Sequence, residues 1–284
     1  LGFLRAYSTF DHPIHYGAFV ASTFALIWTS ENRVWRQRKR AVLAAGATFL
    51  GLSSAPMLSF GVQTGLIAAE RFTRTIPRRV ILGLALIALG MTAMSLGSNR
   101  TPFAIIATGF TLDPWTGFYR LLIWQHGLDN VARSPVFGIG LGDWTREWWM
   151  ASDSIDAFWL VIMMRMGVTA LVALLLAITL LLVAVHNQRI AMTREIRRVV
   201  IAWTFSMIAL SLAGCTVHYW NNIHAYFFFL LGLMAWVGDP RLARRRAALM
   251  AKARGRAVQR PVPQRPQPGM GDTRPPLPMP HTPQ

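Results

Sequence analysis

The amino-acid sequence predicts an all-α fold: a polytopic bundle of transmembrane helices with one large extracytoplasmic loop. Of the 284 residues 53% are hydrophobic and only 14% are charged, and the cations stand in short clusters between apolar runs. A water-soluble domain carries about 25% charged residues. The formal net charge of +17 does not indicate nucleic-acid binding, because the Lys and Arg residues form no stripe on a polar domain. Their clustering is typical of membrane topology signals.

Apolar segments follow one another along residues 1–238, and several approach the roughly 20 residues that a helix needs to cross a bilayer. The run 41–70 is long enough for two short crossings. Pro56 and the small residues before it interrupt this run, which favours a tight helical hairpin because proline breaks a continuous helix. Together with this hairpin, about seven crossings are expected, the other five near residues 13–30, 80–97, 157–185, 199–217 and 223–238.

The positions of the cations predict how these crossings are oriented. Of the 29 Lys and Arg residues, 23 lie in four segments: 31–40, 71–79, 186–198 and the residues after 239. All four fall on one side of a membrane if 41–70 crosses an even number of times, which supports the hairpin independently. The positive-inside rule makes that side cytoplasmic. The loop 98–156 then lies on the opposite side.

The two ends of the chain differ from the apolar part. The sequence begins at Leu1, with no charged segment and cleavage site of a signal peptide, so we expect an N-terminally incomplete chain with further helices before it. Residues 239–284 are basic and then proline-rich, which predicts a disordered cytoplasmic tail. Its basic cluster is either a topology signal or an attachment to anionic lipid.

The loop 98–156 is the expected location of the chemistry. It holds six of the twelve acidic residues, and a loop of this length is usually functional or disordered. Its many aromatic residues argue against disorder. Residues 118–131 have helical spacing, and the three glycines that follow predict a tight turn, because glycine tolerates positive φ. These glycines are Gly138, Gly140 and Gly142.

Motifs in and around this loop resemble those of the O-antigen ligase and polymerase superfamily. Arg120-Leu-Leu-Ile-Trp124, followed by Ser134-Pro-Val-Phe-Gly-Ile-Gly-Leu-Gly-Asp-Trp144, is similar to its R-x-x-x-W and hP-hh-G-x-G motifs. Asp156-Ala-Phe-Trp-Leu160 and then Gly167 resemble its H-N-x-x-L segment and following glycine. Gly2-Phe-Leu-Arg5 with Asp11-His12-Pro13 resembles the polar stretch before a late crossing. The likeness covers residues 1 to about 238.

The resemblance implies a metal-independent, C-class-like glycosyltransferase without cofactors in the bacterial inner membrane. Its substrate is an undecaprenyl-diphosphate-linked glycan, used in the periplasm, and its partners include membrane lipid, a chain-length regulator and a flippase. Ligases transfer the glycan to lipid A core, and polymerases join repeat units. Ligase members carry a histidine where this chain has Asp156, and Ala157 replaces the asparagine. We therefore expect a polymerase-like member making O-antigen or exopolysaccharide, with a ligase as the alternative.

Arginines on the cation-poor side are the candidates for binding the diphosphate, because a guanidinium holds phosphate bidentately and neutralises charge on the leaving group. Arg5 and Arg120 lie there, and Arg165 stands within an apolar run. Each has a plainer role in a headgroup contact, a loop ion pair or snorkelling. Asp153 and Asp156 are candidates for orienting a sugar hydroxyl as catalytic residues beside Arg120. Either Asp is equally suited to cap the next helix.

Trp144, Trp149 and His12 are the candidate sugar contacts. The two tryptophans can stack on a pyranose, with anchoring at the interface as the alternative, and His12 is a polar group of the outer face near sugar or lipid headgroups. No metal site is expected, because no Glu accompanies the histidines near residues 12 and 218. Cys215 is the single cysteine, which excludes a disulfide.

Two functions of other classes compete with a glycosyltransferase. A transporter places ionisable groups near the bilayer midplane on broken helices and has paired repeats, whereas here the polar residues gather in one loop and no repeat is found. A non-catalytic scaffold for polysaccharide assembly tolerates the loss of Arg5 and Arg120, so point variants distinguish it from an enzyme.

Overall fold

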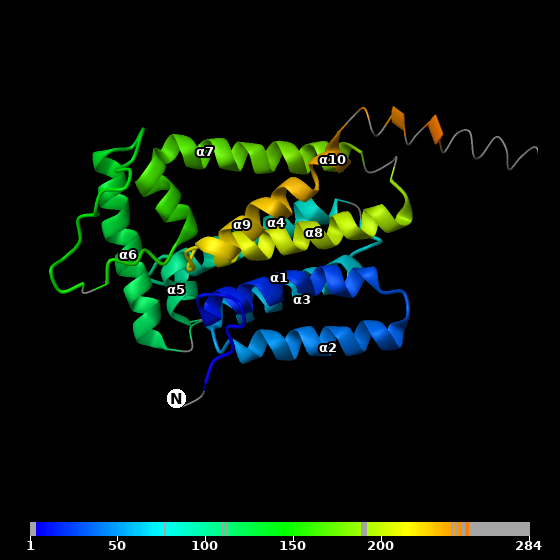
Figure 1. Cartoon of the computed structure of the whole chain (residues 1–284), viewed down its shortest axis with the longest axis horizontal. Coiled ribbons are helices and arrows are strands. Elements are labelled where there is room, and N and C mark those ends of the chain that lie inside the picture. The colour runs from blue at the N-terminus through cyan, green and yellow to red at the C-terminus, as the bar shows by residue number, and fades with distance from the viewer. Residues whose placement is uncertain are drawn as a thin grey trace, which may run out of the picture. The chain divides into compact units, whose positions relative to one another are not determined.

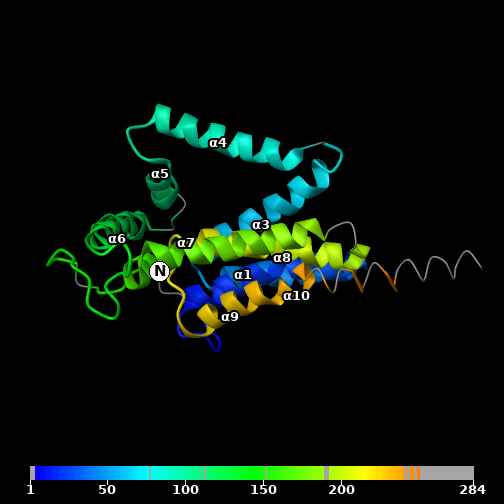
Figure 2. The same ribbon diagram turned by 90° about the horizontal axis from the view of Figure 1, so that it is seen from above.

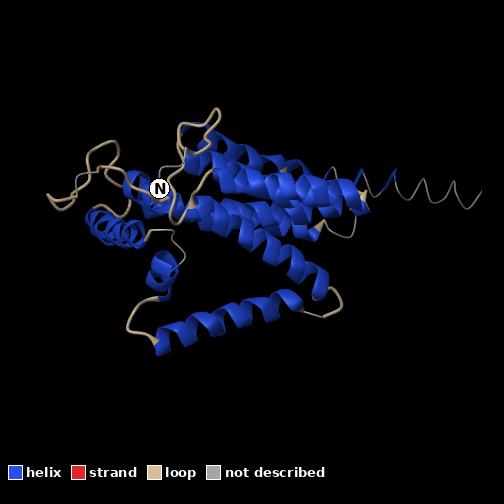
Figure 3. Ribbon diagram, turned by 90° about the horizontal axis from the view of Figure 1, so that it is seen from below, coloured by secondary structure: helices blue, strands red, loops and turns tan. Residues whose placement is uncertain are grey.

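The computed structural model describes residues 4–76, 78–109, 111, 113–150, 152–188 and 192–239, together with five residues between 241 and 249. The chain divides into two compact units, Leu1–Ala243 and Arg244–Gln284. The predicted disordered tail lies almost entirely outside the described residues. Over the described part the chain is helical and contains no strand (Figures 1 and 3), which confirms the all-α class.

The described helices follow the predicted crossings closely and add two short elements. The helical spacing expected at 118–131 corresponds to the long helix α6 inside the loop 98–156. In chain order the helices are α1 (Pro13–Ser30), α2 (Val34–Leu50), α3 (Ser54–Phe72), α4 (Arg79–Gly97), α5 (Pro102–Gly109), α6 (Pro114–Arg133), α7 (Phe158–Asn187), α8 (Arg194–Ala213), α9 (Asn221–Leu233) and α10 (Ala235–Gly238).

The apolar run 41–70 is a helical hairpin, as predicted. Helices α2 and α3 meet at residues 51–53, and Pro56 lies in the first turn of α3, where proline is tolerated. Gly51 permits this turn to approach α1, since a Cβ atom there would lie 3.1 Å from the carbonyl oxygen of Pro13. The prediction of a loop over 31–40 is wrong from Val34 onward, because Arg and Lys are good helix formers and continue α2.

Helix α8 also begins earlier than the predicted crossing at 199–217. Thr193 caps it, accepting a hydrogen bond of 3.2 Å from the backbone N–H of Ile196, so the charged residues 194–198 belong to the helix. The predicted crossing 223–238 is divided at Met234 into α9 and α10.

Helix α1 lies at the centre of the helices α2, α3 and α8, and polar side chains join it to two of them. Gln63 of α3 is fully buried; its Nε2 donates to the carbonyl oxygen of Ala21 at 2.5 Å, and its Oε1 accepts from the N–H of Ala25 at 3.1 Å. Ser206 of α8 donates to the carbonyl oxygen of Ser22 at 2.5 Å. Buried polar contacts between helices are typical of membrane bundles.

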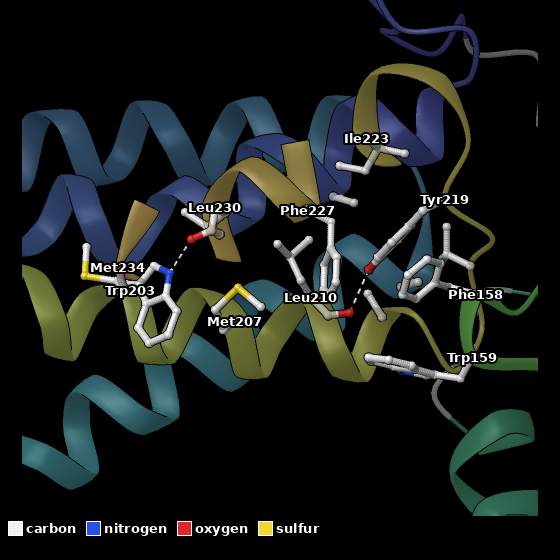
Figure 4. Close-up of a cluster of buried hydrophobic side chains, with 14 of the residues drawn as sticks. Phe158, Trp159, Trp203, Met207, Leu210, Tyr219, Ile223, Phe227, Leu230 and Met234 are labelled. Carbon is white, nitrogen blue, oxygen red and sulfur yellow. Dashed lines mark hydrogen bonds between the residues drawn. The ribbon is translucent and has the colours of Figure 1, made fainter. Parts of the chain in front are cut away.

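The largest cluster of buried side chains lies where α8 and α9 meet the start of α7 (Figure 4). Three hydrogen bonds to backbone carbonyls satisfy polar atoms of this cluster: Trp203 Nε1 donates to Leu230 at 2.6 Å, the Tyr219 hydroxyl to Leu210 at 2.6 Å, and Trp159 Nε1 to Ser211 at 2.8 Å. Phe158 stacks on Tyr219 with ring centroids 4.9 Å apart. The start of α7 is therefore held firmly, which matters because the candidate site directly precedes it.

Two of the described helices, α7 and α8, are long and apolar enough to cross a membrane by length and composition. A shorter apolar helix covers Ile81–Gly97 within α4. This is fewer than the expected seven crossings: α2 begins with cations, α9 has only 13 residues, and α1 and α3 contain polar residues. Helix α4 stands apart from the other long helices in Figures 2 and 3.

The helices place their connections at two ends. At the first, which we call the loop end, the N–H of Ala6 donates to the carbonyl oxygen of Leu50 at 3.0 Å, and that of Phe158 donates to Val217 at 3.0 Å. At the second, the basic end, Arg198 Nη1 donates to Asn32 Oδ1 at 2.7 Å. This last contact joins two of the cation-rich segments, 31–40 and 186–198, at one end, as predicted.

Candidate functional site

Arg120 is positioned by helix α6, whose start is strongly determined by sequence. Asp113 caps the helix, accepting from the N–H of Trp115 at 3.2 Å and from the hydroxyl of Thr116 at 2.9 Å, and a proline follows it. One and a half turns later, the Arg120 side chain is buried, with 6% exposed, and its Nε atom has no hydrogen-bond partner among the described residues. A buried guanidinium nitrogen without a partner is costly, so it indicates a place for an anion.

Arg120 lies on the wall of a cavity of about 350 Å³ at the loop end. The walls come from α3, α5, α6 and the end of α8, and they are mostly apolar, with Leu58, Phe103, Ile106 and Leu212 among them. Arg120 is the one charged side chain among the described residues that line it. The cavity therefore combines an apolar space with a single guanidinium.

Asp156 is the carboxylate that acts on Arg120. Burial lowers the pKa of the Arg120 guanidinium, and the negative charge of Asp156 opposes this shift. The capping alternative for Asp156 and Asp153 is wrong: α7 begins after Ala157, which makes no side-chain cap, and Asp156 Oδ1 instead accepts from the Ser154 hydroxyl at 2.8 Å. Asp153 is exposed. Of the two predicted aspartates, Asp156 is therefore the one whose charge acts on Arg120.

The N-terminal segment brings two further predicted residues to the same place. His12 is half-buried at the N-cap of α1, where its Nδ1 accepts from the N–H of Ile14 at 3.2 Å. Burial lowers the pKa of His12, the charge of Arg5 lowers it further, and Asp156 opposes both. Arg5 itself is exposed. Arg5, His12, Arg120 and Asp156 therefore form one electrostatically coupled group, which we call the outer cluster.

His218 joins the outer cluster and was not singled out as a catalytic candidate from the sequence. Its Nδ1 atom is buried without a hydrogen-bond partner in the described part of the chain. Burial lowers its pKa to about 4, with smaller contributions from the charges of His15 and His224, and Asp156 opposes them. The connection was hidden because residues 156 and 218 come near each other only where the start of α7 bonds to the segment 214–217 that follows α8. The described residues contain no group of three His, Cys, Asp or Glu side chains suited to a metal ion.

The glycine-rich segment docks on a break in helix α7. Gly167 has φ 85° and ψ 167°, which interrupts the helix, and a Cβ atom there would lie 2.0 Å from the carbonyl oxygen of Val136. The predicted turn is confirmed at Gly138 and Gly140, which have φ of 69° and 61°, whereas Gly142 does not have a positive φ. Close backbone contact therefore requires glycine on both sides of this junction.

Arg165 fastens this junction instead of facing the cavity at Arg120. Its Nη1 donates to the carbonyl oxygen of Gly140 at 3.0 Å and also to that of Gly142. These bonds occupy Nη1, so Arg165 positions the glycine-rich segment, and its diphosphate role stays a prediction. The sequence pattern suggested a charge inside a membrane helix because the break at Gly167 is not visible in it.

The two predicted sugar-stacking tryptophans have different environments. Trp144 is only 3% exposed, and its Nε1 donates to the carbonyl oxygen of Asp153 at 3.0 Å, so it holds the loop together and is a poor platform for a sugar. Trp149 is 44% exposed and keeps that role as a prediction. Asn130 adds a second fastening, exchanging hydrogen bonds of 2.7 and 2.8 Å with the backbone of Thr145.

Comparison of the sequence with protein-family models and with curated proteins gives no match.

Proposed function

We propose that this chain is a multi-pass inner-membrane glycosyltransferase that polymerises undecaprenyl-diphosphate-linked oligosaccharide repeats into O-antigen or exopolysaccharide. The observation that carries the proposal is Arg120: a buried guanidinium with an unpartnered Nε, coupled to Asp156, on the wall of an apolar cavity. An apolar polyprenyl chain suits the apolar walls of this cavity, and the diphosphate to which it is linked suits the guanidinium of Arg120. The motifs around Arg120, Gly138 and Asp156 support the same reaction class.

The exposed apolar surface supports the membrane location. Only 6% of the most apolar window of α7 is buried, unlike the core helix of a soluble protein. Along α4, Leu84, Leu86, Ile87 and Leu89 are each 60% or more exposed. Continuous exposed apolar faces of this kind suit lipid. In the proposed topology α1, α2, α3, α4, α7, α8 and the pair α9–α10 cross the bilayer, the loop end is periplasmic, and the basic end is cytoplasmic.

The proposed chemistry divides the outer cluster into two roles. The acceptor sugar hydroxyl attacks the anomeric carbon of the lipid-linked glycan, a new C–O bond forms, and the bond between that carbon and the diphosphate breaks. Asp156 orients the hydroxyl and takes its proton. Arg120 stabilises the negative charge that develops on the leaving undecaprenyl diphosphate, and the exposed Arg5 is the second candidate for this role.

The experiment that tests this proposal is the polysaccharide profile, by gel and mass, of cells whose complete gene carries Arg120→Ala at unchanged membrane abundance. Arg133→Ala is the matched control, because Arg133 is exposed at the end of the same helix. We expect single-repeat lipid-linked glycan in place of long chains for Arg120→Ala alone. Long polymer that stays on the carrier would instead indicate a ligase. A wild-type profile would contradict both and leave a transporter or scaffold.

A further inference from the structure

We propose a second ligand site, at the basic end, which binds the phosphate headgroup of an anionic phospholipid. A cavity of about 560 Å³ lies there between α1, α3 and α8, at the opposite end of these helices from the cavity at Arg120. The site depends on the proposed membrane topology but not on the proposed glycosyl transfer. The cavity is lined by arginines at its rim and by apolar side chains inside, and these two linings define the chemistry of the ligand.

Three arginines line this cavity, two at the end of α3 and one in α8. Arg71 and Arg74 lie at and just beyond the end of α3, and Arg198 lies in the second turn of α8. Arg198 already donates to Asn32 Oδ1 at 2.7 Å, which fixes its direction toward the turn between α1 and α2. Arginines that converge from separate elements offer several donors to one phosphate, and these bonds are charge-assisted.

Two carboxylates share the cavity wall, and the nearby cations outweigh them. Glu31 is paired with Arg40 at 3.3 Å and accepts two backbone N–H groups at 3.1 Å, so its charge is largely compensated. Arg36 adds its positive charge near Glu31. Glu70 also lines the cavity. The rim therefore remains net positive, as an anionic headgroup requires.

The inner wall of the same cavity is apolar. Aromatic and branched side chains of α1, α3 and α8 face it, namely Phe24, Trp28, Ile67, Ile201 and Phe205. A free phosphate ion gains nothing from contact with an apolar surface, whereas the first methylene groups of an acyl chain are stabilised by packing against it. Trp35, 76% exposed in the adjoining turn of α2, suits the headgroup region of a bilayer. The combination points to a phospholipid of the leaflet that the cations face.

The test uses the full chain in neutral detergent, titrated with phosphatidylglycerol, with phosphatidylcholine and with inorganic phosphate. Retained lipid is counted by native mass spectrometry, and the apparent Tm is recorded. The test variant combines Arg71→Gln, Arg74→Gln and Arg198→Gln. The matched control combines Arg33→Gln, Arg38→Gln and Lys39→Gln, which removes the same charge from exposed positions in and directly before α2 at the same end.

We expect wild type and the control to retain phosphatidylglycerol alike, and the cavity variant to bind it about tenfold more weakly, as loss of charge-assisted hydrogen bonds predicts. Arg74→Gln alone, beyond the end of α3, gives a smaller weakening without a risk to folding. Equal losses in both triple variants, unchanged binding in the cavity variant, or an equal response to inorganic phosphate would each overturn the site. Arg120→Ala retains the lipid, which separates this result from failure of the proposed enzyme function.

Discussion

The backbone N–H of Val168 donates a hydrogen bond of 2.7 Å to the carbonyl oxygen of Pro135. Helix α7 is broken just before this residue, and the glycine-rich segment supplies bonds that the helix lacks there. The N–H of Ile139 likewise donates to Met164 at 2.7 Å. Hydrogen bonds thus attach the segment after α6 to the first half of α7. Because Asp156 lies between these two attached parts of the chain, they restrict where it can lie.

Gly167→Ala is expected to destabilise the protein by at least about 2 kcal/mol, because the backbone conformation is one that only glycine adopts readily and the new Cβ atom meets the carbonyl of Val136. Gly90→Ala is the control, since nothing lies within 4 Å of a Cβ there, in the middle of α4. Thermal unfolding in detergent measures both. Equal Tm values for the two variants would show that the junction is not strained by a side chain.

Trp144→Ala and Trp149→Ala are expected to separate stability from function. The first removes a buried ring and should cost about 3–5 kcal/mol. The second removes a ring that is 44% exposed, so Tm should change little, while polymer synthesis falls if the ring contacts sugar. Tm and the polysaccharide profile are measured on the same preparations. A large loss of Tm in Trp149→Ala would contradict this assignment.

Asp156→Asn is expected to reduce polymer synthesis by roughly 10²–10⁴-fold, the range for loss of a general base. It should also lower the pKa of His12 further, because the Asp156 charge now opposes that shift. Asp129→Asn, at an exposed position of α6, is the control. An NMR titration measures the pKa of His12 in the variant, and this readout does not depend on enzyme activity. An unchanged His12 titration would mean that the two groups are not coupled.

The stability of the protein is expected to fall as the pH decreases from 6.5 toward 4. The folded-state pKa of His218 is about 4, below its ordinary 6.5, so the unfolded chain binds more protons in this window and folding loses free energy there. The contribution is on the order of 1–2 kcal/mol after allowance for solvent screening. His218→Gln should make the decline of Tm shallower, although His12 leaves part of it. An identical slope in the variant would contradict the burial of His218.

Gln63→Leu is expected to destabilise the contact between α1 and α3 by about 0.6–2 kcal/mol, the range for interhelical hydrogen bonds in membranes. It removes the bonds to the backbone of Ala21 and Ala25. Thr64→Val is the neighbouring control, because the Thr64 hydroxyl bonds only within its own helix, to Phe60 at 2.9 Å. Unfolding in detergent gives the free energy of unfolding of both variants. A larger loss for Thr64→Val than for Gln63→Leu would contradict the role of Gln63 between the helices.

The helices were predictable because their signals are local. Pro13 marks the start of α1, and the apolar run after Ala157 coincides with α7, whereas α6 begins at Pro114, four residues before the predicted helical spacing. The ends that depend on context were less accurate: α2 and α8 extend into their basic segments, because Lys and Arg are helix formers as well as topology signals. The number of crossings likewise cannot be read from helix length when polar residues pair between helices.

By itself, the sequence determined that the chain is helical, where its cations gather and which residues are candidates for binding a diphosphate. Only the tertiary structure decided that Arg120 is buried where the charge of Asp156 acts on it, that Trp144 is enclosed while Trp149 is exposed, and that the charge of Asp156 also acts on His218. The physical reason is that helix propensity and hydrophobic pattern act over a few neighbouring residues. Burial, charge coupling and the loss of hydrogen-bond partners depend on which distant helices pack against a side chain.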